Sequence, residues 1–246
     1  MKKQLLVPLL ATCLCTVAVP VLAQQTAQAL PPALQAALLS GNGSYIQSAI
    51  QTLSAGNPTQ AANLAALVVA RAEQLLKTNP QAAVAAAVAA LEIVRQHSVS
   101  TGSPQQTLTT VVTAARIFAS PQAQGAAPQQ VASGVLAATV ISANPAVYSS
   151  NPQAAIQVMG SLYQTAQSAT LLANVPSLQT NVVQILSTAS QSNALSSANP
   201  SNAVQIQQIL AKAGEGRQIT EGATGAPSRS ESPLIIENNS SQASPT

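Results

Sequence analysis

Residues 151–166 read NPQAAIQVMGSLYQTA, an Asn-Pro pair followed by apolar residues at helical spacing. The side chain of Asn151 can cap free backbone N–H groups, and Pro152 suits the first helical turn, where its missing N–H costs nothing. Spacings of three and four residues place the apolar side chains on one helix face. These side chains belong to Ile156, Met159, Leu162 and Ala166. The stretch therefore predicts an amphipathic helix.

The same pattern recurs along the chain at a fixed interval. Six prolines occupy every twenty-fourth position, namely Pro80, Pro104, Pro128, Pro152, Pro176 and Pro200. Pro58 and Pro32 precede this series at nearly the same interval, so two imperfect units extend the register. Asn79, Ser103 and Asn199 are further predicted caps. Internal periodicity of this length is typical of a repeat architecture.

Each predicted helix carries its own apolar face. The other units contribute Val84, Ala87, Val88 and Leu91, then Leu108, Val111, Val112 and Ala115, and later Val182, Val183, Leu186 and Ala189. A short segment of small residues follows each helix, with one apolar residue nineteen positions after the proline. These residues are Val99, Val147, Leu171 and Leu195. The segment predicts a second, shorter helix or a turn that completes the unit.

These observations predict an all-α fold: a right- or left-handed α-solenoid of seven to eight 24-residue helix-plus-short-helix repeats, followed by a disordered C-terminal tail. A β-solenoid is the alternative, and the abundance of Ala, Gln and Leu argues against it. The period and the two-part unit resemble leucine-rich variant repeats. The charged and proline signature of that family is absent, so the resemblance implies no membership.

Four regions follow from these patterns. Residues 1–23 predict a signal peptide: Lys2 and Lys3 precede an apolar run, and Val21-Leu22-Ala23 suits cleavage before Gln24. An uncleaved membrane anchor and a lipoprotein modified at Cys13 are the alternatives. Residues 24–43 form a lead-in with a first short helix over residues 33–39. The helical repeat domain spans residues 44–213, with Ser44 as a predicted cap.

The fourth region, residues 214–246, is rich in Gly, Ser, Pro, Glu and Asn and predicts a disordered polar tail. Within it, Pro233-Leu234-Ile235-Ile236 is a short apolar island. The Leu234–Ile236 patch is either an incidental hydrophobic spot or a docking motif that adds a strand to a partner.

Composition argues against most enzyme classes. The chain has 6% charged residues, no Asp and one His, and both cysteines, Cys13 and Cys15, lie in the predicted signal peptide. Cleavage would therefore leave no disulfide, no thiolate metal site and no cysteine nucleophile. The common zinc and calcium sites, the Ser-His-Asp triad and phosphate-binding glycine loops are all missing. We expect no catalytic, cofactor-binding or metal-binding residues, and no cofactor.

The titratable and aromatic residues fit structural roles. The spacings Glu73–Lys77 and Glu92–Arg95 are those of surface ion pairs on a helix, and His97 is predicted to cap a helix C-terminus. Basic residues are too scattered for a nucleic-acid interface. The aromatic residues are too few for a carbohydrate-stacking platform and are expected in the core or a groove: Tyr45, Phe118, Tyr148 and Tyr163.

What remains is a neutral polar surface. Gln153, Gln157 and Gln164 lie along one predicted helix and Gln205, Gln207 and Gln208 along another, serving either solubility or partner binding. We expect an exported, non-enzymatic helical-repeat scaffold in the periplasm or outside the cell, which binds an unknown protein or polysaccharide partner. It should hold no integral membrane segment after cleavage. The alternative is a self-assembling structural protein of the cell surface or extracellular matrix, because open solenoids have exposed ends.

Overall fold

The computed structural model describes residues 30–221, with side chains described for residues 30–212. Within this part of the chain every regular element is a helix, which confirms the predicted all-α class. The helices are α1 (Pro32–Ser40), α2 (Gly43–Ser54), α3 (Pro58–Leu75), α4 (Pro80–Val94), α5 (His97–Gly102), α6 (Pro104–Ala119), α7 (Pro121–Ala126), α8 (Pro128–Ser142), α9 (Pro145–Ser150), α10 (Pro152–Ala166), α11 (Ala169–Asn174), α12 (Leu178–Ser190), α13 (Asn193–Ala198) and α14 (Asn202–Glu221).

The spaced prolines set the starts of the long helices. Pro58 begins α3, and the first four prolines of the regular series begin α4, α6, α8 and α10. Pro176 and Pro200 instead lie in turns, and α12 and α14 begin two residues later. The residue before each of the six prolines still has the same backbone, with φ between −139° and −162° and ψ between 58° and 103°. A following proline disfavours the α region for the residue before it, so each long helix is separated from the helix that precedes it.

The predicted short helices are also present. They are α5, α7, α9, α11 and α13, which begin at the same interval as the prolines and have six residues each. The third residue of each is buried: Val99, Ala123, Val147, Leu171 and Leu195. Four of these five are the apolar residues singled out from the sequence. One buried side chain anchors each short helix to the core.

The asparagine caps form where the sequence predicts them in α4 and α10. The Oδ1 atom of Asn79 accepts a hydrogen bond from the N–H of Ala82 at 3.0 Å, and Oδ1 of Asn151 accepts from that of Ala154 at 3.1 Å. These bonds satisfy amide groups that have no partner within the helix.

Three predicted caps are wrong in detail. Ser103 makes no cap bond; its hydroxyl donates to Oγ1 of Thr59 at 3.1 Å, because α3 passes close to it. Asn199 accepts from the N–H of Ser201 inside a turn, ahead of α14. Helix α2 begins two residues earlier than predicted, and Asn42 rather than Ser44 is its cap. An Asn before a Gly competes well for the cap position.

Loss of one cap should be measurable. We expect Asn151→Ala to lower the free energy of unfolding by about 1 kcal/mol, since the N–H of Ala154 loses its acceptor. Urea titration followed by circular dichroism would measure the change. Asn151→Ser keeps a cap acceptor and should lose less. Equal stability of the wild type and the alanine variant would contradict the proposed role of this Asn-Pro pair.

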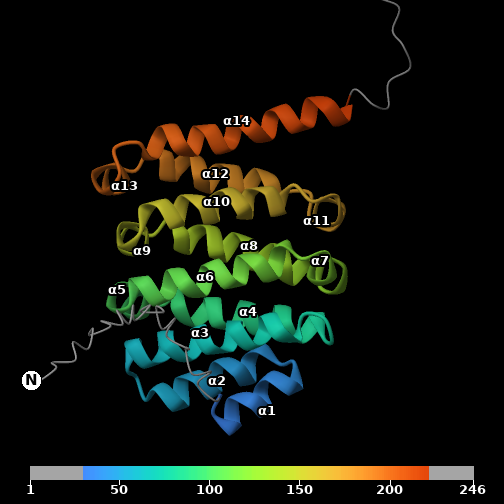
Figure 1. The fold of residues 1–246 in the computed structure, drawn as a ribbon, viewed down its shortest axis with the longest axis vertical. Coiled ribbons are helices and arrows are strands. Elements are labelled where there is room, and N and C mark those ends of the chain that lie inside the picture. The colour runs from blue at the N-terminus through green and yellow to red at the C-terminus, as the bar shows by residue number, and fades with distance from the viewer. Residues whose placement is uncertain (1–29, 222–246) are drawn as a thin grey trace, which may run out of the picture.

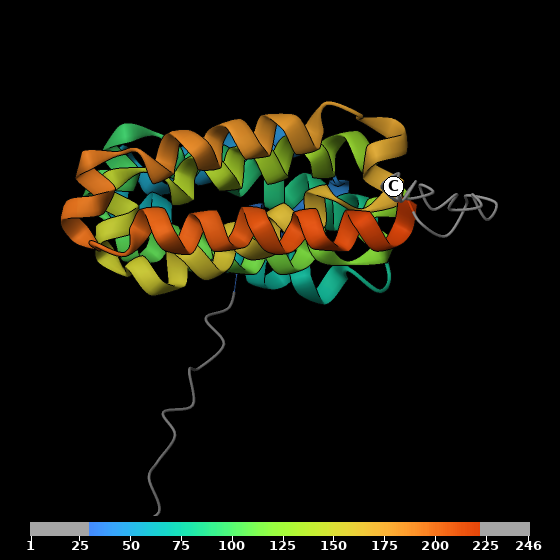
Figure 2. The same cartoon turned by 90° about the horizontal axis from the view of Figure 1, so that it is seen from above.

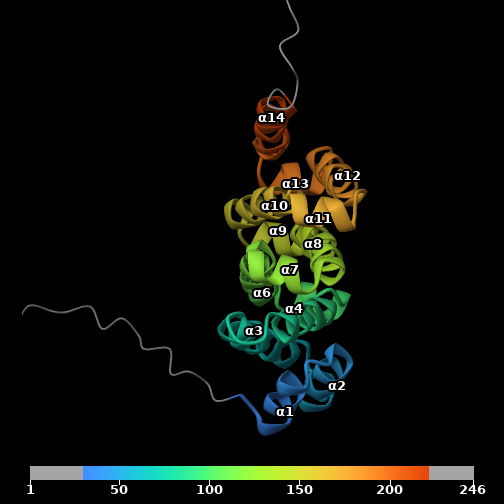
Figure 3. The same cartoon turned by 90° about the vertical axis from the view of Figure 1, so that its right-hand side faces the viewer.

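The long helices alternate between two layers (Figures 1 and 3). Layer A contains α2, α4, α8 and α12, and layer B contains α3, α6, α10 and α14. The short helices α5, α9 and α13 lie at one end of the long helices, and α7 and α11 lie at the other (Figure 1). Seen from above, the last helices of the two layers run side by side (Figure 2). Adjacent helices of one layer are therefore two units apart in the sequence.

Polar contacts between neighbouring helices reflect this doubled period. The hydroxyl of Ser168 donates to Oε1 of Gln124 at 2.5 Å, across 44 residues, while Nε2 of Gln124 donates to the carbonyl of Phe118 at 3.0 Å. The Ser103–Thr59 bond also spans 44 residues. In these contacts, the side chains of one unit thus meet those of the unit two positions later in the chain, and not those of the unit that directly follows.

The core lies between the layers and is richest in alanine at α4. All but four of the fifteen residues of α4 are buried, and it contacts helices of both layers. A Cβ at Gly43 would lie 3.5 Å from the carbonyl oxygen of Ala85, so α2 crosses α4 closely. The apolar positions predicted in each unit are buried or, at Val88, Val112 and Val183, partly buried. Small side chains allow this tight stacking of helices.

One large side chain interrupts the small residues. Phe118, in α6, is completely buried. Its ring lies against Gly134 of α8, where an added Cβ would fall 2.3 Å from Cζ of the ring. The absence of a side chain at Gly134 makes room for the ring.

The ends of the chain only partly match the predicted regions. Helix α1 confirms the first short helix of the lead-in, with bounds one residue wider at each end. Helix α14 continues to Glu221, so residues 214–221 are helical although they were predicted to belong to the tail. Good helix formers between Gly214 and Glu221 outweigh two glycines there. The predicted signal peptide and residues 222–246 lie outside the described residues.

Candidate functional site

Four charged side chains of the repeats form two surface ion pairs. Glu92 and Arg95 make the predicted ion pair, with Nη2 3.0 Å from Oε2. Both side chains are at least one-third exposed. An exposed pair of this kind contributes at most about 1 kcal/mol to stability.

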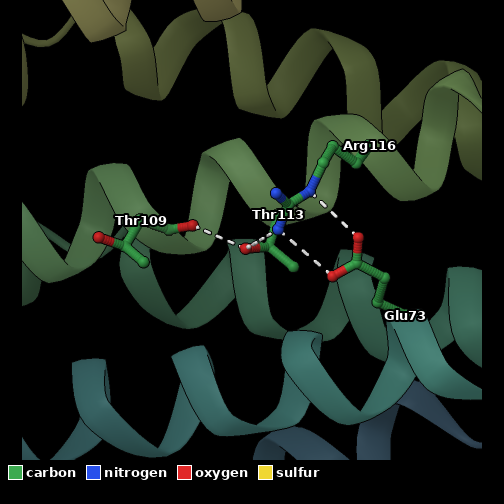
Figure 4. A network of polar contacts seen from close by, with 4 residues as sticks. All are labelled: Glu73, Thr109, Thr113 and Arg116. Carbon is green, nitrogen blue, oxygen red and sulfur yellow. Dashed lines mark hydrogen bonds and ion pairs between the residues drawn. The ribbon is translucent and has the colours of Figure 1, made fainter. Parts of the chain in front are cut away.

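Glu73 pairs with a different residue than predicted. Its carboxylate lies 3.1 Å and 3.3 Å from two nitrogens of Arg116, which also donates to the hydroxyl of Thr113 at 3.4 Å (Figure 4). The predicted partner was Lys77, four residues further along the chain. Arg116 lies on α6, the next helix of layer B, and its planar guanidinium matches both carboxylate oxygens. The pair therefore connects two helices of one layer.

His97 begins a helix instead of capping one. It is the first residue of α5 and is exposed. Its carbonyl oxygen accepts hydrogen bonds from the hydroxyls of Ser100 and Thr101 at 3.2 and 2.6 Å. The prediction that the imidazole of His97 caps a helix C-terminus is thus wrong, and the hydrogen bonds of this residue to Ser100 and Thr101 come from its main chain. Among the side chains of residues 30–212, no three from His, Cys, Asp or Glu are grouped as metal ligands would be.

Three of the four aromatic residues lie in the core, as expected. Phe118 and Tyr148 are fully buried, Tyr163 is 4% exposed, and Tyr45 is 64% exposed on α2. The hydroxyl oxygen of Tyr148 accepts a hydrogen bond from Nδ2 of Asn199 at 3.2 Å. Burial raises the pKa of Tyr148 above 10.0, and the hydrogen bond from Asn199 opposes this shift.

The raised pKa of Tyr148 predicts alkaline sensitivity. The folded state holds the phenol proton of Tyr148 more tightly than the unfolded state does. The contribution of this proton to the free energy of unfolding is therefore fully present below pH 10.0 and is lost as the pH rises through the pKa of the folded state. We expect the melting temperature to fall above about pH 10, and that of Tyr148→Phe to fall less steeply. Thermal melts from neutral to strongly alkaline pH would measure both slopes. Parallel slopes would contradict the assignment to Tyr148; Tyr45→Phe is the exposed control.

The outer face of layer B carries amide and hydroxyl side chains in register. Two rows cross its four long helices, with one residue from each helix or from the turn that leads into it. The first row is Thr59, Gln105, Gln153 and Ser201, and the second is Asn63, Thr109, Gln157 and Gln205. All eight are exposed except Gln205, which is half-buried. Successive members of a row are two units apart in sequence. The rows therefore run along the stack, across the helix axes.

Of the glutamines predicted to form a polar face, Gln153, Gln157 and Gln205 belong to the two rows, whereas Gln207 and Gln208 lie on other sides of the last helix. Gln153, Gln157 and Gln164 are all exposed on α10, and Gln207 and Gln208 are exposed on α14. The rows themselves were missed, because neighbouring helices of the layer are two units apart. The regular proline spacing combined with the alternation of layers would have revealed them.

A hollow of about 650 Å³ opens on the same layer, where α6 begins beside the end of α9. Its lining is Ser103, Pro104, Gln105, Gln106, Thr109 and Ser150, none of which is ionisable. Amides and hydroxyls both donate and accept hydrogen bonds. The face can therefore bind groups that do the same, such as sugar hydroxyls or peptide amides.

A second hollow, of about 340 Å³, lies between α2 and the end of α4, which are both helices of layer A. Its lining is Gln47, Gln51, Glu92, Ile93, Arg95 and Gln96. It includes the ion pair. Layer A repeats the first row as Gln81, Gln129 and Ser177, but its second row is interrupted at α4, where the equivalent residue is the buried Ala85. We therefore take the outer face of layer B as the candidate site.

Between Leu30 and Glu221 no helix combines the length and apolarity needed to cross a bilayer. Comparisons of the chain with protein-family models, curated proteins and solved structures gave no significant match.

Proposed function

We propose that the chain is an exported, non-enzymatic α-solenoid scaffold that binds a protein or polysaccharide partner along the outer face of layer B. The solenoid interpretation is supported by helices that recur at the proline interval and alternate between two layers. Stacking of this kind builds a continuous core from units that could not fold alone. It also produces long faces on which side chains repeat.

The two rows of amide and hydroxyl side chains carry the proposal. A row such as Thr59, Gln105, Gln153 and Ser201 offers one hydrogen-bonding group per helix, and adjacent helices pack about 8–10 Å apart. An extended partner with polar groups at a similar repeat could contact several helices at once. Many weak contacts along one extended partner add up to a higher total affinity than any single contact provides.

Export is the part of the proposal that depends on residues 1–23. Lys2 and Lys3 precede an apolar run that is shorter than a typical membrane span, followed by a small-residue cleavage pattern. The periplasm or the cell exterior would be the destination. Low charge and no mature cysteine give the scaffold little to titrate or oxidise there.

Self-assembly is the competing function, and the last helix argues against stacking at that end. Two units before Val204, Gln207 and Ala211, the equivalent positions are Ile156, Met159 and Tyr163, which are buried in α10. In α14 a methionine is thus replaced by glutamine and a tyrosine by alanine. A smaller or more polar outer surface is the mark of a capping unit. Light scattering should find a monomer at every concentration; assemblies that grow with concentration would favour the structural role.

The partner-binding face can be tested with two matched triple variants. The test variant changes Gln105, Gln153 and Gln157 of layer B to Glu. The control changes Gln81, Gln129 and Asn181 to Glu, which lie near the same helical positions in layer A and are also exposed. Each purified chain is immobilised and exposed to solubilised cell envelope and to a panel of neutral and acidic polysaccharides.

We expect the wild type and the layer A control to retain the same partner. Unpaired carboxylates should reduce retention by the layer B variant about tenfold or more, equivalent to at least about 1.4 kcal/mol. The identity of the retained material would distinguish protein from polysaccharide. Equal retention by both triple variants would contradict binding at this face, and turnover of any panel member would contradict a non-enzymatic role.

A further inference from the structure

An apolar hollow lies at the opposite end of the stack from α14. It has a volume of about 260 Å³ and is lined by Leu30, Gln35, Leu38, Leu39, Arg71, Gln74 and Leu75. Four of the seven lining residues are leucines, and the side chain of Leu39 is 76% exposed. No other large apolar side chain of residues 30–212 is so exposed.

The hollow follows from the lengths of two helices. Helix α1 has nine residues, whereas its neighbour α3 has eighteen. The shorter helix leaves the last turns of α3 over a recess between Leu30 and Leu75. At the C-terminal end of the stack, Gln207 and Gln208 are exposed on α14 beside Val204, which is 57% exposed.

Two segments of this chain lie outside the described residues and could reach the recess. Residues 24–29, which directly precede it after the expected cleavage, read QQTAQA and offer no apolar side chain larger than alanine. Residues 222–246 contain one apolar island, Pro233-Leu234-Ile235-Ile236. Of these two segments, only the second can fill a leucine-lined recess with large aliphatic side chains.

Charge favours the same match. Arg71 lies on the rim of the hollow, and Lys77 is exposed just beyond the end of α3. The island is flanked by Glu231 and Glu237. Acidic residues on both sides of an apolar core would meet basic residues beside an apolar recess.

The connecting chain is long enough. Helices α3 and α14 both belong to layer B and end at the same side of the stack (Figure 1). Three helix spacings separate them, about 24–30 Å. The segment 222–233 connects the end of α14 to the island, and its twelve residues span about 40 Å when extended. The island can reach the recess within one molecule.

We propose that Pro233–Ile236 docks in the hollow between α1 and α3 of its own chain, with Glu231 and Glu237 directed to Arg71 and Lys77. The contact closes the N-terminal end of the stack with a segment from its C-terminal end. It goes beyond the proposed partner-binding function, since it uses neither row of layer B. It also covers the exposed side chain of Leu39.

Cysteine cross-linking in the full chain tests the contact. In a background with Cys13→Ser and Cys15→Ser, the test pair is Gln35→Cys with Ser232→Cys. The control pair is Gln157→Cys with Ser232→Cys, which places the first cysteine on exposed α10, nearer to α14 in layer B. Disulfide formation under a mild oxidant is followed on non-reducing gels, at several protein concentrations.

We expect the test pair to form a monomeric disulfide at least about tenfold faster than the control, at a rate independent of concentration, because docking raises the effective concentration. Leu234→Asp with Ile235→Asp should slow it to the control rate. Arg71→Glu should also slow it, and adding Glu231→Lys and Glu237→Lys should restore it. Circular dichroism checks that each variant keeps its helices.

Two kinds of result would overturn the proposal. Equal rates for the test and control pairs, or no effect of the two aspartates, would show that the island does not dock in the hollow. Disulfide-linked dimers whose yield rises with concentration would show that the occupant comes from a neighbouring copy. Neither result depends on partner retention by the face of layer B, so the two proposals fail separately.

Discussion

Replacing Phe118 by alanine is expected to lower the free energy of unfolding by about 3–5 kcal/mol. The ring is fully buried and packs on α8, and the carbonyl of Phe118 accepts the hydrogen bond from Gln124. Alanine would remove the ring without filling its space, because Gly134 on the facing helix has no side chain to contribute. Both the transfer energy of the ring and the cavity left behind count against the variant.

Urea unfolding of the wild type and Phe118→Ala, monitored by circular dichroism, measures this loss. Tyr45→Ala is the matched control, since it removes an aromatic ring that is 64% exposed. That change should stay within about 0.5 kcal/mol. A loss at Phe118 no larger than that at Tyr45 would show that the ring does not hold α6 and α8 together.

Gly134→Ala is expected to destabilise by about 1–3 kcal/mol. Helix propensity alone predicts the opposite, because alanine is favoured over glycine in a helix interior by about 1 kcal/mol. Packing outweighs propensity: the new Cβ would lie 2.3 Å from Cζ and 2.8 and 2.9 Å from the two Cε atoms of Phe118. The ring is rigid and fully buried, so it can move only if the two helices separate.

A glycine with open space around it provides the control. A Cβ at Gly125, in α7, would meet nothing within 4 Å. Gly125→Ala should therefore stabilise by about 0.5–1 kcal/mol through propensity. In the double variant Phe118→Leu with Gly134→Ala, the smaller side chain relieves the clash, so the loss should be less than the sum of the single losses. Strict additivity would contradict direct contact.

The pairing of Phe118 with Gly134 shows where sequence reasoning stops short. Phe118 is the fourteenth residue after the proline of its unit, and the equivalent residues of other units are Val94, Ser142 and Ala166. Gly134 is the sixth residue after the proline of the following unit, and its equivalents are Thr110, Val158 and Val182. The largest residue of one series faces the smallest of the other. The compensation is visible only once these two positions are known to be adjacent.

Local signals were sufficient for most of the fold. Asn79-Pro80 and Asn151-Pro152 predict helix starts correctly because capping and the loss of the proline N–H act within a few residues. The spacing of apolar residues predicts the buried faces for the same reason. Ser103 fails as a cap because its hydroxyl is directed to Thr59, a residue far away in the sequence. Such a contact cannot be read from the residues around Ser103.

The candidate site depended on longer-range information. Exposed glutamines such as Gln153 and Gln157 were recognisable from helical periodicity. Their alignment with Gln105 and Thr109 was not, because a repeat shows which positions share an environment but not which side of the stack each unit occupies. Glu73 was assigned to Lys77 for the same reason, since its true partner, Arg116, lies on the adjacent helix of layer B.

Because successive long helices alternate between the two layers, the effect of adding or removing units depends on whether their number is odd or even. Removing one unit, for example residues 104–127, would move every later helix to the opposite layer and bring Gln153 out beside the outer side chains of α4. Removing two units, residues 104–151, would shorten the stack and leave each remaining helix in its own layer. Insertions and deletions that preserve a binding face must therefore occur two units at a time, although the sequence repeats with every unit.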